Sequence, residues 1–219
     1  MCNEELIGNV SNRLLGEKLG ALLSCLEDCN RSKRISLSGI PGSGKTTIAL
    51  ALAKNLEGIY LQEFLDPLPK LVLDTRGDST VEQQISAQEW IISQYKSKAE
   101  LIKQFPTKSV LVQDRGVIDG LAYSAVYKPG VLDAIRSGCE TYDWPRLFSI
   151  ILIADDITVR QRMIMREQFS EEFFDSSWLL YIQELREKYV QISKEIACPL
   201  VDTSDKTQQE VVSEILGLL

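Results

Sequence analysis

The chain has 219 residues, which is enough for one domain with a sizeable core and too few for two, because domains cluster near about 100–200 residues. Its formal net charge of −7 argues against a nucleic-acid polymer as partner, since duplex binding depends on Lys and Arg that neutralise phosphates. There is no signal-peptide pattern and no run of about 18 apolar residues, so no membrane association is expected. We predict a single domain over residues 1–219.

The cysteines lie at positions 2, 25, 29, 139 and 198, an odd number without a compact framework. This usage is typical of reduced thiols and predicts a cytoplasmic protein. A zinc site is not expected, because the chain has no histidine and no pair of cysteines at CxxC spacing.

Residues 1–33 are predicted to form a leading helical segment. Within it, residues 11–30 carry leucines at the three- and four-residue spacing of an amphipathic helix. We expect this helix to pack against a sheet. The leucines are Leu14, Leu15, Leu19, Leu22, Leu23 and Leu26.

Short apolar runs then alternate with helical patterns, which is typical of a parallel sheet covered by helices on both faces. The five predicted strands are Arg34–Ser38, Ile59–Gln62, Val110–Gln113, Phe148–Ala154 and Cys198–Val201. The predicted helices cover about 45–56, 80–104, 117–126, 156–168, 176–196 and 207–218. A lid is expected over about 156–175.

The loop after the first strand reads GIPGSGKTT, and its residues 39–46 fit the pattern GxxxxGK[ST] between a strand and a helix. In such a loop the backbone N–H groups surround phosphate oxygens, Lys45 reaches the β- and γ-phosphates, and Thr46 offers its hydroxyl to Mg²⁺. The alternative is an ordinary glycine-rich turn with a solvated lysine. The predicted nucleotide-binding residues are Gly39, Pro41, Gly42, Ser43, Gly44, Lys45, Thr46 and Thr47.

Carboxylates follow two of the other strands. Asp114 ends the third strand beside the phosphate loop, where a Mg²⁺ bridging the phosphates would lie, and Arg115 follows at once. Glu63 follows the second strand and, in a chain without histidine, is the expected general base or anchor for an attacking hydroxyl or phosphate. The alternatives are a structural ion pair for Asp114 and Arg115 and an exposed loop acid for Glu63.

Two arginines follow the fourth strand on one face of a helix. Arg162 and Arg166 are four residues apart, a spacing suited to a phosphoryl group whose charge grows in the transition state. A solvated helix face is the alternative.

The segments GIPGSGKTT, QEF, QDRGVIDGLAY and RQRMIMREQFSEE, in this order, resemble the deoxynucleoside kinase and thymidylate kinase group of P-loop enzymes. The resemblance covers about residues 34–206. It implies a three-layer P-loop NTPase-type α/β fold with a five-stranded parallel sheet, helices on both faces and a short lid.

The resemblance also implies roles for single residues. Glu63 is implied as base or substrate anchor, Asp114 and Arg115 as contacts of Mg²⁺ and substrate, and Arg162 and Arg166 as lid arginines. A base-reading glutamine is matched by Gln88, with Trp90 near it. The last strand and its loop, through Asp202 and Ser204, are implied to lie along the adenine. Arg76 is a candidate contact of a monophosphate acceptor or a solvated arginine.

From these observations we expect a kinase that transfers the γ-phosphate of ATP, with Mg²⁺, to a nucleoside or nucleoside monophosphate. The alternatives are a P-loop kinase of another small metabolite, a regulatory ATPase without a small-molecule acceptor, and a nucleotide sensor without activity. The resemblance further implies a homodimer.

Overall fold

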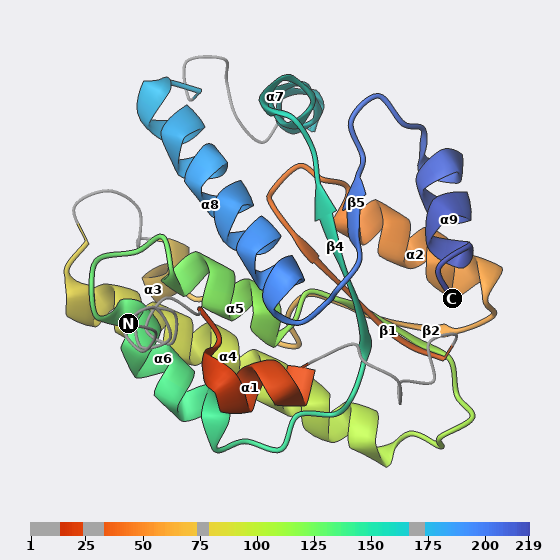
Figure 1. Cartoon of the computed structure of the whole chain (residues 1–219), viewed down its shortest axis with the longest axis horizontal. Coiled ribbons are helices and arrows are strands. Elements are labelled where there is room, and N and C mark those ends of the chain that lie inside the picture. The colour runs from red at the N-terminus through yellow and green to blue at the C-terminus, as the bar shows by residue number, and fades with distance from the viewer. Residues whose placement is uncertain (1–13, 24–32, 74–78, 167–173) are drawn as a thin grey trace, which may run out of the picture.

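The computed structural model describes residues 14–23, 33–73, 79–166 and 174–219. Its centre is a five-stranded sheet with the order β2-β3-β1-β4-β5, in which every neighbouring pair is parallel (Figure 1). The strands are β1 (Arg34–Gly39), β2 (Ile59–Leu61), β3 (Leu111–Asp114), β4 (Phe148–Ile153) and β5 (Leu200–Asp202).

Helices cover both faces of this sheet. They are α1 (Gly16–Leu23), α2 (Lys45–Asn55), α3 (Lys70–Leu73), α4 (Val81–Gln104), α5 (Val117–Ser124), α6 (Val131–Glu140), α7 (Asp156–Met165), α8 (Ser176–Glu195) and α9 (Gln208–Leu216). Helices α2 and α9 lie on one face, while α1, α4, α5, α6 and α8 lie on the other, so the fold has three layers (Figure 1). The predicted fold class is confirmed.

Burial explains why the central strand reads as a nearly continuous apolar run. In β1 every residue after Arg34 is buried, because β3 and β4 flank the strand and helices cover both of its faces. Leu37 is fully buried, and removing a side chain of this size from water contributes about 1.5–3 kcal/mol. The central position of β1 places the loop that follows it at the middle of the carboxyl edge of the sheet.

Local signals set several helix ends. Thr80 caps α4 in a reciprocal pair with Gln83, in which each side chain accepts a hydrogen bond from the backbone of the other. Asp155 caps α7 by accepting from the Thr158 amide at 2.6 Å. The capping carboxylate follows β4 directly, so the strand and the helix after it are tightly connected.

The structure corrects some predicted elements. Leu14 and Leu15 precede α1, which begins only at Gly16, and the ends of the predicted helix 11–30 lie outside the described residues. The helix predicted over 117–126 ends at Ser124 and is followed by α6, which was not predicted. The short helix α3 was also missed. The last strand lies one to two residues later than expected. Part of the predicted lid, residues 167–173, lies outside the described residues.

The amino-terminal segment is held by α8. The Glu195 carboxylate accepts hydrogen bonds from the amides of Leu14 and Leu15 at 2.9 and 3.0 Å. Leu15 and Leu19 are fully buried in the main core. The leading helix was predicted to pack against the sheet; in the described part of that segment α1 packs on α6, and the residues before it are held by α8.

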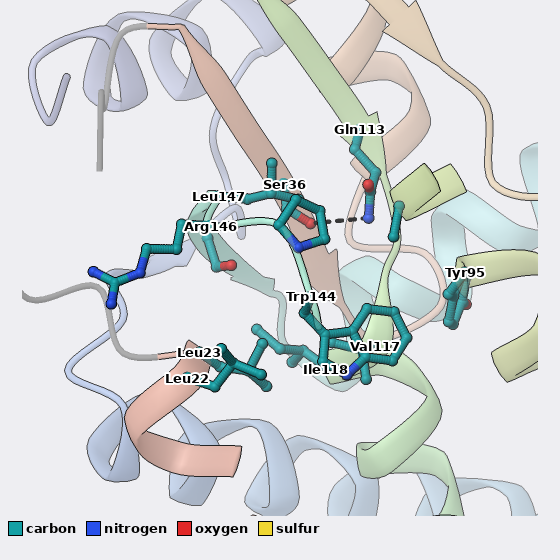
Figure 2. Close-up of a pocket in the computed structure, with 13 residues that line it drawn as sticks. Leu22, Leu23, Ser36, Tyr95, Gln113, Val117, Ile118, Trp144, Arg146 and Leu147 are labelled. Carbon is teal, nitrogen blue, oxygen red and sulfur yellow. Dashed lines mark hydrogen bonds between the residues drawn. The ribbon is translucent and has the colours of Figure 1, made fainter. Parts of the chain in front are cut away.

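A pocket lies between the sheet and α1 (Figure 2). Its floor is a polar row across three strands, because Ser36 pairs in register with Gln113 on one side and with Ser149 on the other. The described residues that line this pocket include none of those predicted for the site.

None of the described helices has both the length and the apolar character needed to cross a membrane.

Candidate active site

The phosphate loop joins β1 to α2 and has the backbone that its glycines allow. Gly39, Gly42 and Gly44 have φ values of 142°, 74° and 89°, a region that residues with a Cβ rarely adopt. At Gly39 the neighbouring strand also comes too close, since an added Cβ would lie 1.9 Å from the carbonyl oxygen of Leu152. The loop conformation therefore depends on glycine for two separate reasons.

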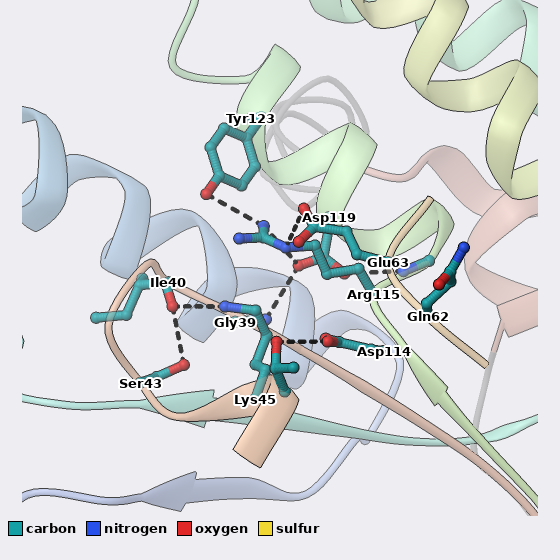
Figure 3. A network of polar contacts seen from close by, with 12 residues as sticks. Gly39, Ile40, Ser43, Lys45, Gln62, Glu63, Asp114, Arg115, Asp119 and Tyr123 are labelled. Carbon is teal, nitrogen blue, oxygen red and sulfur yellow. Dashed lines mark hydrogen bonds and ion pairs between the residues drawn. The ribbon is translucent and has the colours of Figure 1, made fainter. Parts of the chain in front are cut away.

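Lys45 lies inside this loop (Figure 3). Its Nζ donates a 2.7 Å hydrogen bond to the Ile40 carbonyl, and Ser43 donates to the same oxygen at 2.8 Å. Burial is the main cause that lowers the Lys45 pKa to about 7, and the nearby charge of Arg115 acts in the same direction. An anion in the loop would favour the charged form of this lysine.

Thr46 and Asp114 meet next to the loop. The Thr46 hydroxyl donates to Oδ2 of Asp114 at 2.6 Å, and the Tyr60 hydroxyl donates to the same oxygen at 3.2 Å. Within the described part of the chain, the buried Oδ1 of Asp114 has no hydrogen-bond partner. A carboxylate oxygen and a hydroxyl are suitable ligands for Mg²⁺, which needs few protein ligands when phosphates supply others. These residues therefore fit the predicted cation.

Glu63 and Arg115 form an ion pair at the carboxyl ends of β2 and β3 (Figure 3). Arg115 Nε lies 2.7 Å from Glu63 Oε1, and a guanidinium N–H donates to the Tyr123 hydroxyl at 3.2 Å. Arg115 has φ 60°, in the left-handed region that is costly for a residue with a side chain. The arginine is thus held in an unusual conformation beside the carboxylate that was predicted as base or anchor.

Asp119 connects this pair to the phosphate loop. Its carboxylate accepts hydrogen bonds from the amides of Gly39 and Gly116 at 3.2 and 3.0 Å, and from the Tyr189 hydroxyl at 2.7 Å. Arg115 Nη1 lies 3.6 Å from the same carboxylate. The side chain is almost fully buried, so it acts as a fixed link between the loop, α5 and α8.

The two arginines predicted for the lid both reach the phosphate loop. Arg162 donates to the Gly42 carbonyl at 3.4 Å and to the hydroxyl and carbonyl oxygens of Thr203 at 2.9 and 2.7 Å. Arg166 donates to the Thr47 hydroxyl at 3.4 Å. Partial burial, together with the charge of Arg166, lowers the Arg162 pKa. The structure therefore brings both guanidinium groups to the same loop from α7.

The predicted base-reading residues lie on different sides of α4. Gln88 is fully buried, and its Oε1 accepts from the Ser124 hydroxyl of α5 at 3.5 Å. Trp90 instead packs on Phe64, the residue after Glu63, with ring centroids 5.4 Å apart. Trp90 therefore lies near Glu63 by packing on its neighbour Phe64, whereas Gln88 contacts Ser124 of α5.

Asp202 is the last residue of β5, the strand next to β4, and Ser204 lies two residues further along the chain. Asp202 accepts from the Ser204 amide at 2.8 Å, and the Ser204 hydroxyl accepts from the Asp155 amide at 2.8 Å. Thr203, which lies between them, is buried and donates to the Ser43 carbonyl at 3.1 Å. The segment predicted to lie along the adenine therefore touches the phosphate loop through Thr203.

Sequence reasoning missed three residues of this cluster, Lys98, Asp119 and Tyr60, whereas Thr203 lies within the segment expected along the adenine. Asp119 had a detectable signal, since a carboxylate within the otherwise apolar helix start GVIDGLAY is unusual. Lys98 and Tyr60 show their roles only in the folded chain. Arg76 lies outside the described residues, as do three of the five cysteines. The other two, Cys139 and Cys198, are buried.

Comparison with known proteins extends over most of the chain. A probable thymidylate kinase of Methanocaldococcus jannaschii is 26% identical over 186 residues, which are 84% of this chain and 94% of that protein. One of Methanococcus aeolicus is 28% identical over 200 residues, covering 86% and 96%. The resemblance to the kinase group stated from the sequence is confirmed.

Solved structures give the same fold. A deoxyadenosine kinase from M. mycoides, with products dCMP and a flexible dCDP bound, has a TM-score of 0.67 at 16% identity and covers 84% of this chain and 97% of its own. The thymidylate kinase from Candida albicans has a TM-score of 0.64 at 14% identity, with coverage of 86% and 91%. The family model described as AAA domain matches residues 35–175. This match spans well over half of the sequence, so the chain belongs to the AAA domain family.

Proposed function

We propose that this protein is an ATP-dependent kinase that transfers the γ-phosphate of ATP to a nucleoside or nucleoside monophosphate. The observation that carries the proposal is that two pairs of interacting side chains lie together at the carboxyl edge of the sheet. Thr46 and Asp114 lie beside the phosphate loop, and Glu63 and Arg115 lie next to them. The similarity to probable thymidylate kinases over most of the chain supports the same activity and makes thymidylate the first acceptor to test.

The donor side of the site consists of the loop and α7. Backbone N–H groups of the loop and the start of α2 would hold the phosphates of ATP, and Lys45 would exchange its hydrogen bond with the Ile40 carbonyl for one with a phosphate oxygen. Arg162 in α7 and Arg166 directly after it donate hydrogen bonds to Gly42 and Thr47 of the GIPGSGKTT segment. Fixed positive groups of this kind stabilise charge that spreads over the transferred phosphoryl group.

Thr46 and Asp114 are the residues that would hold Mg²⁺. When bound, the ion neutralises phosphate charge and polarises the phosphoryl oxygens. Among the described residues no group of three or more Asp, Glu, Cys or His could form a closed metal cage. That finding agrees with a cation whose remaining ligands are phosphates and water, as is usual for Mg²⁺.

The acceptor side consists of the ends of β2 and β3. Glu63 would orient the attacking oxygen and receive its proton late in the transfer, which needs little basicity because the transition state is loose. Arg115, now paired with Glu63 at 2.7 Å, would hold the acceptor through its guanidinium.

A predicted lid over about 156–175 would close the donor side. The homodimer, the cytoplasmic location and the lack of a nucleic-acid partner stay predictions.

The test is ADP production from Mg-ATP with each nucleoside, deoxynucleoside and monophosphate in turn, and with no acceptor. We expect one acceptor, thymidylate first, to stimulate turnover, and we expect the phosphorylated acceptor to appear in equal amount. A rate that no acceptor changes would contradict the proposal and favour a regulatory ATPase. Stimulation only by other small alcohols or phosphates would favour a kinase of another metabolite.

A further inference from the structure

Lys98 lies in the second half of α4 with its side chain fully buried. Its Nζ donates three hydrogen bonds to main-chain carbonyls: to Gln62 at 3.1 Å, to Asp114 at 2.8 Å and to Arg115 at 2.8 Å. An ammonium group has three N–H donors, so this set uses all of them. The protonated lysine is therefore a buried cation whose three N–H donors all form hydrogen bonds within the protein.

The three carbonyls belong to the two segments that carry the acceptor side of the site. Gln62 directly precedes Glu63, and the other two carbonyls belong to Asp114 and Arg115 themselves. Lys98 thus joins the carboxyl ends of β2 and β3 at a point beyond their last ladder pair, which joins Leu61 to Gln113. The other side-chain ties between the two segments are the ion pair of Glu63 with Arg115 and the hydrogen bond from Tyr60 to Asp114.

The backbone of Arg115 needs such support. A residue with a side chain in the left-handed region is strained and persists only where its surroundings fix it. The Arg115 amide donates to the Leu37 carbonyl at 2.9 Å, and its carbonyl accepts from the Gln113 side chain at 2.6 Å as well as from Lys98. Lys98 is the only charged donor in this set, and charge-assisted hydrogen bonds are the stronger kind.

Core packing alone does not explain a lysine at this position. Taking an ammonium group out of water is costly, and an apolar side chain of similar volume would fill the same space without that cost. Burial accordingly lowers the Lys98 pKa to about 7, while Asp114, Asp119 and Glu63 oppose this shift. The Tyr95 ring, 5.1 Å from Nζ, gives further support to the cation.

We propose that Lys98 is a positioning residue for phosphoryl transfer, which fixes the main chain at Gln62 and Arg115 so that Glu63 and Arg115 face the acceptor together. This inference rests on the proposed kinase function. Lys98 touches no reacting atom and acts through the two residues that do. It should therefore affect the acceptor and the chemical step more than the binding of ATP, which the loop after β1 and the arginines of α7 would hold.

The experiment uses Lys98→Met, which keeps the length and removes the donors, and Lys98→Gln, which keeps part of the donor capacity. The matched control is Lys96→Met, the same change on another face of α4, where Nζ donates to the Gly138 carbonyl of α6 at 3.2 Å. We expect Lys98→Met to lower kcat/KM for the acceptor about 100-fold, the usual effect of a misplaced group, with KM for ATP changed less than about twofold. Lys98→Gln should lie between wild type and Lys98→Met, and Lys96→Met should match wild type.

A double-variant cycle separates positioning from general stabilisation. In an Arg115→Ala, Glu63→Gln background, Lys98→Met should cause little further loss, because the groups that it positions are gone. A full additional loss in that background would overturn the proposal, as would a failure of both Lys98 variants to fold, which would make Lys98 a residue of the core.

Crystal structures of wild type and Lys98→Gln give a readout that needs no activity. We expect Arg115 to leave the left-handed region in the variant and its ion pair with Glu63 to break. An unchanged Arg115 backbone would overturn the inference. If wild type shows no acceptor-dependent turnover, the kinase proposal fails, and this structural arm still decides whether Lys98 fixes Arg115.

Discussion

The Thr46 hydroxyl and the Asp114 carboxylate are joined by a hydrogen bond of 2.6 Å between the start of α2 and the end of β3. Tyr60 donates to the same carboxylate oxygen, while Oδ1 of Asp114 has no hydrogen-bond partner among the described residues and is the oxygen that we propose to bind Mg²⁺. We expect Tyr60→Phe to raise the Mg²⁺ concentration for half-maximal rate about 10-fold, since groups that orient a metal ligand typically contribute 10–100-fold to affinity. Asp114→Asn should raise it further.

The measurement is the initial rate against Mg²⁺ at a fixed, low ATP concentration. Tyr127→Phe, a half-buried tyrosine on the loop after α5, is the matched control and should leave the curve in place. Equal Mg²⁺ dependence in Asp114→Asn and wild type would remove Asp114 from the metal site.

Lys45→Met should lower kcat by about 10²–10³-fold, the usual loss when a preorganised positive group is removed from a site of charge development. The fold should survive, because Lys45 is buried with one internal hydrogen bond and an apolar chain of similar length fits there. Turnover and the thermal unfolding midpoint, measured on the same preparation, check both parts. Near-normal turnover in a folded Lys45→Met variant would rule out the predicted role.

Glu63→Gln tests whether the carboxylate acts in the chemical step or only holds the acceptor. If Glu63 accepts the proton, kcat should fall by about 10²–10⁴-fold with little change in KM for ATP. Loss of the charge also breaks the ion pair with Arg115, so KM for the acceptor is measured alongside. A change confined to that KM would make Glu63 an anchor. Glu89→Gln, an exposed glutamate on α4, is the control.

Gly39→Ala should strongly destabilise the protein. The substitution places a Cβ within 1.9 Å of the Leu152 carbonyl and forces a side chain into φ 142°, so β1 and β4 must separate. Gly20→Ala is the matched control, since its Cβ would meet nothing within 4 Å and alanine favours the helix. Thermal midpoints compare the two, with about 2–4 °C expected per kcal/mol for a domain of this size. Equal midpoints would refute the steric argument.

Asp155→Ala should lower the free energy of unfolding by about 1 kcal/mol through loss of the cap of α7. The Thr158 amide lowers the Asp155 pKa from its ordinary value of 3.8, so the charged form is favoured in the folded protein. The extra stability is therefore present above pH 3.8 and is lost as the pH falls through the lower folded pKa. Urea unfolding of wild type and Asp155→Ala at pH 7 and near pH 3 should show the difference shrink. Asp155→Asn should keep most of the cap.

The strands and the phosphate loop could be predicted because their signals are local. Each strand is a short apolar run, and the loop has its glycines, Lys45 and Thr46 in sequence. Helix α6 was missed because it is only ten residues long, has an apolar stripe of three residues, Val131, Ile135 and Cys139, and follows a Pro-Gly turn that is typical of a loop. Short amphipathic helices are formed mainly by tertiary packing, in this case against α4 and α5.

The same contrast between local signals and tertiary contacts applies to the residues of the candidate site. Glu63, Asp114 and Arg115 could be placed together from the sequence, because parallel strands end at one edge of a sheet. Lys98 could not, since a lysine on a long helix normally lies in water, and only the fold shows that its face of α4 meets the ends of β2 and β3. The contacts of Thr203 with Ser43 and Arg162 likewise depend on how β5 lies beside β4.

The strand order β2-β3-β1-β4-β5 also has a consequence for how such a protein can diversify. The residues that would choose the acceptor follow β2 and β3, and the arginines and the adenine segment that would contact ATP follow β4 and β5. In the described sheet, these two halves are joined by β1. Changes of acceptor can accumulate on one flank without disturbing the use of ATP on the other. Selection can therefore alter the two specificities separately, provided that the central strand and its loop stay the same.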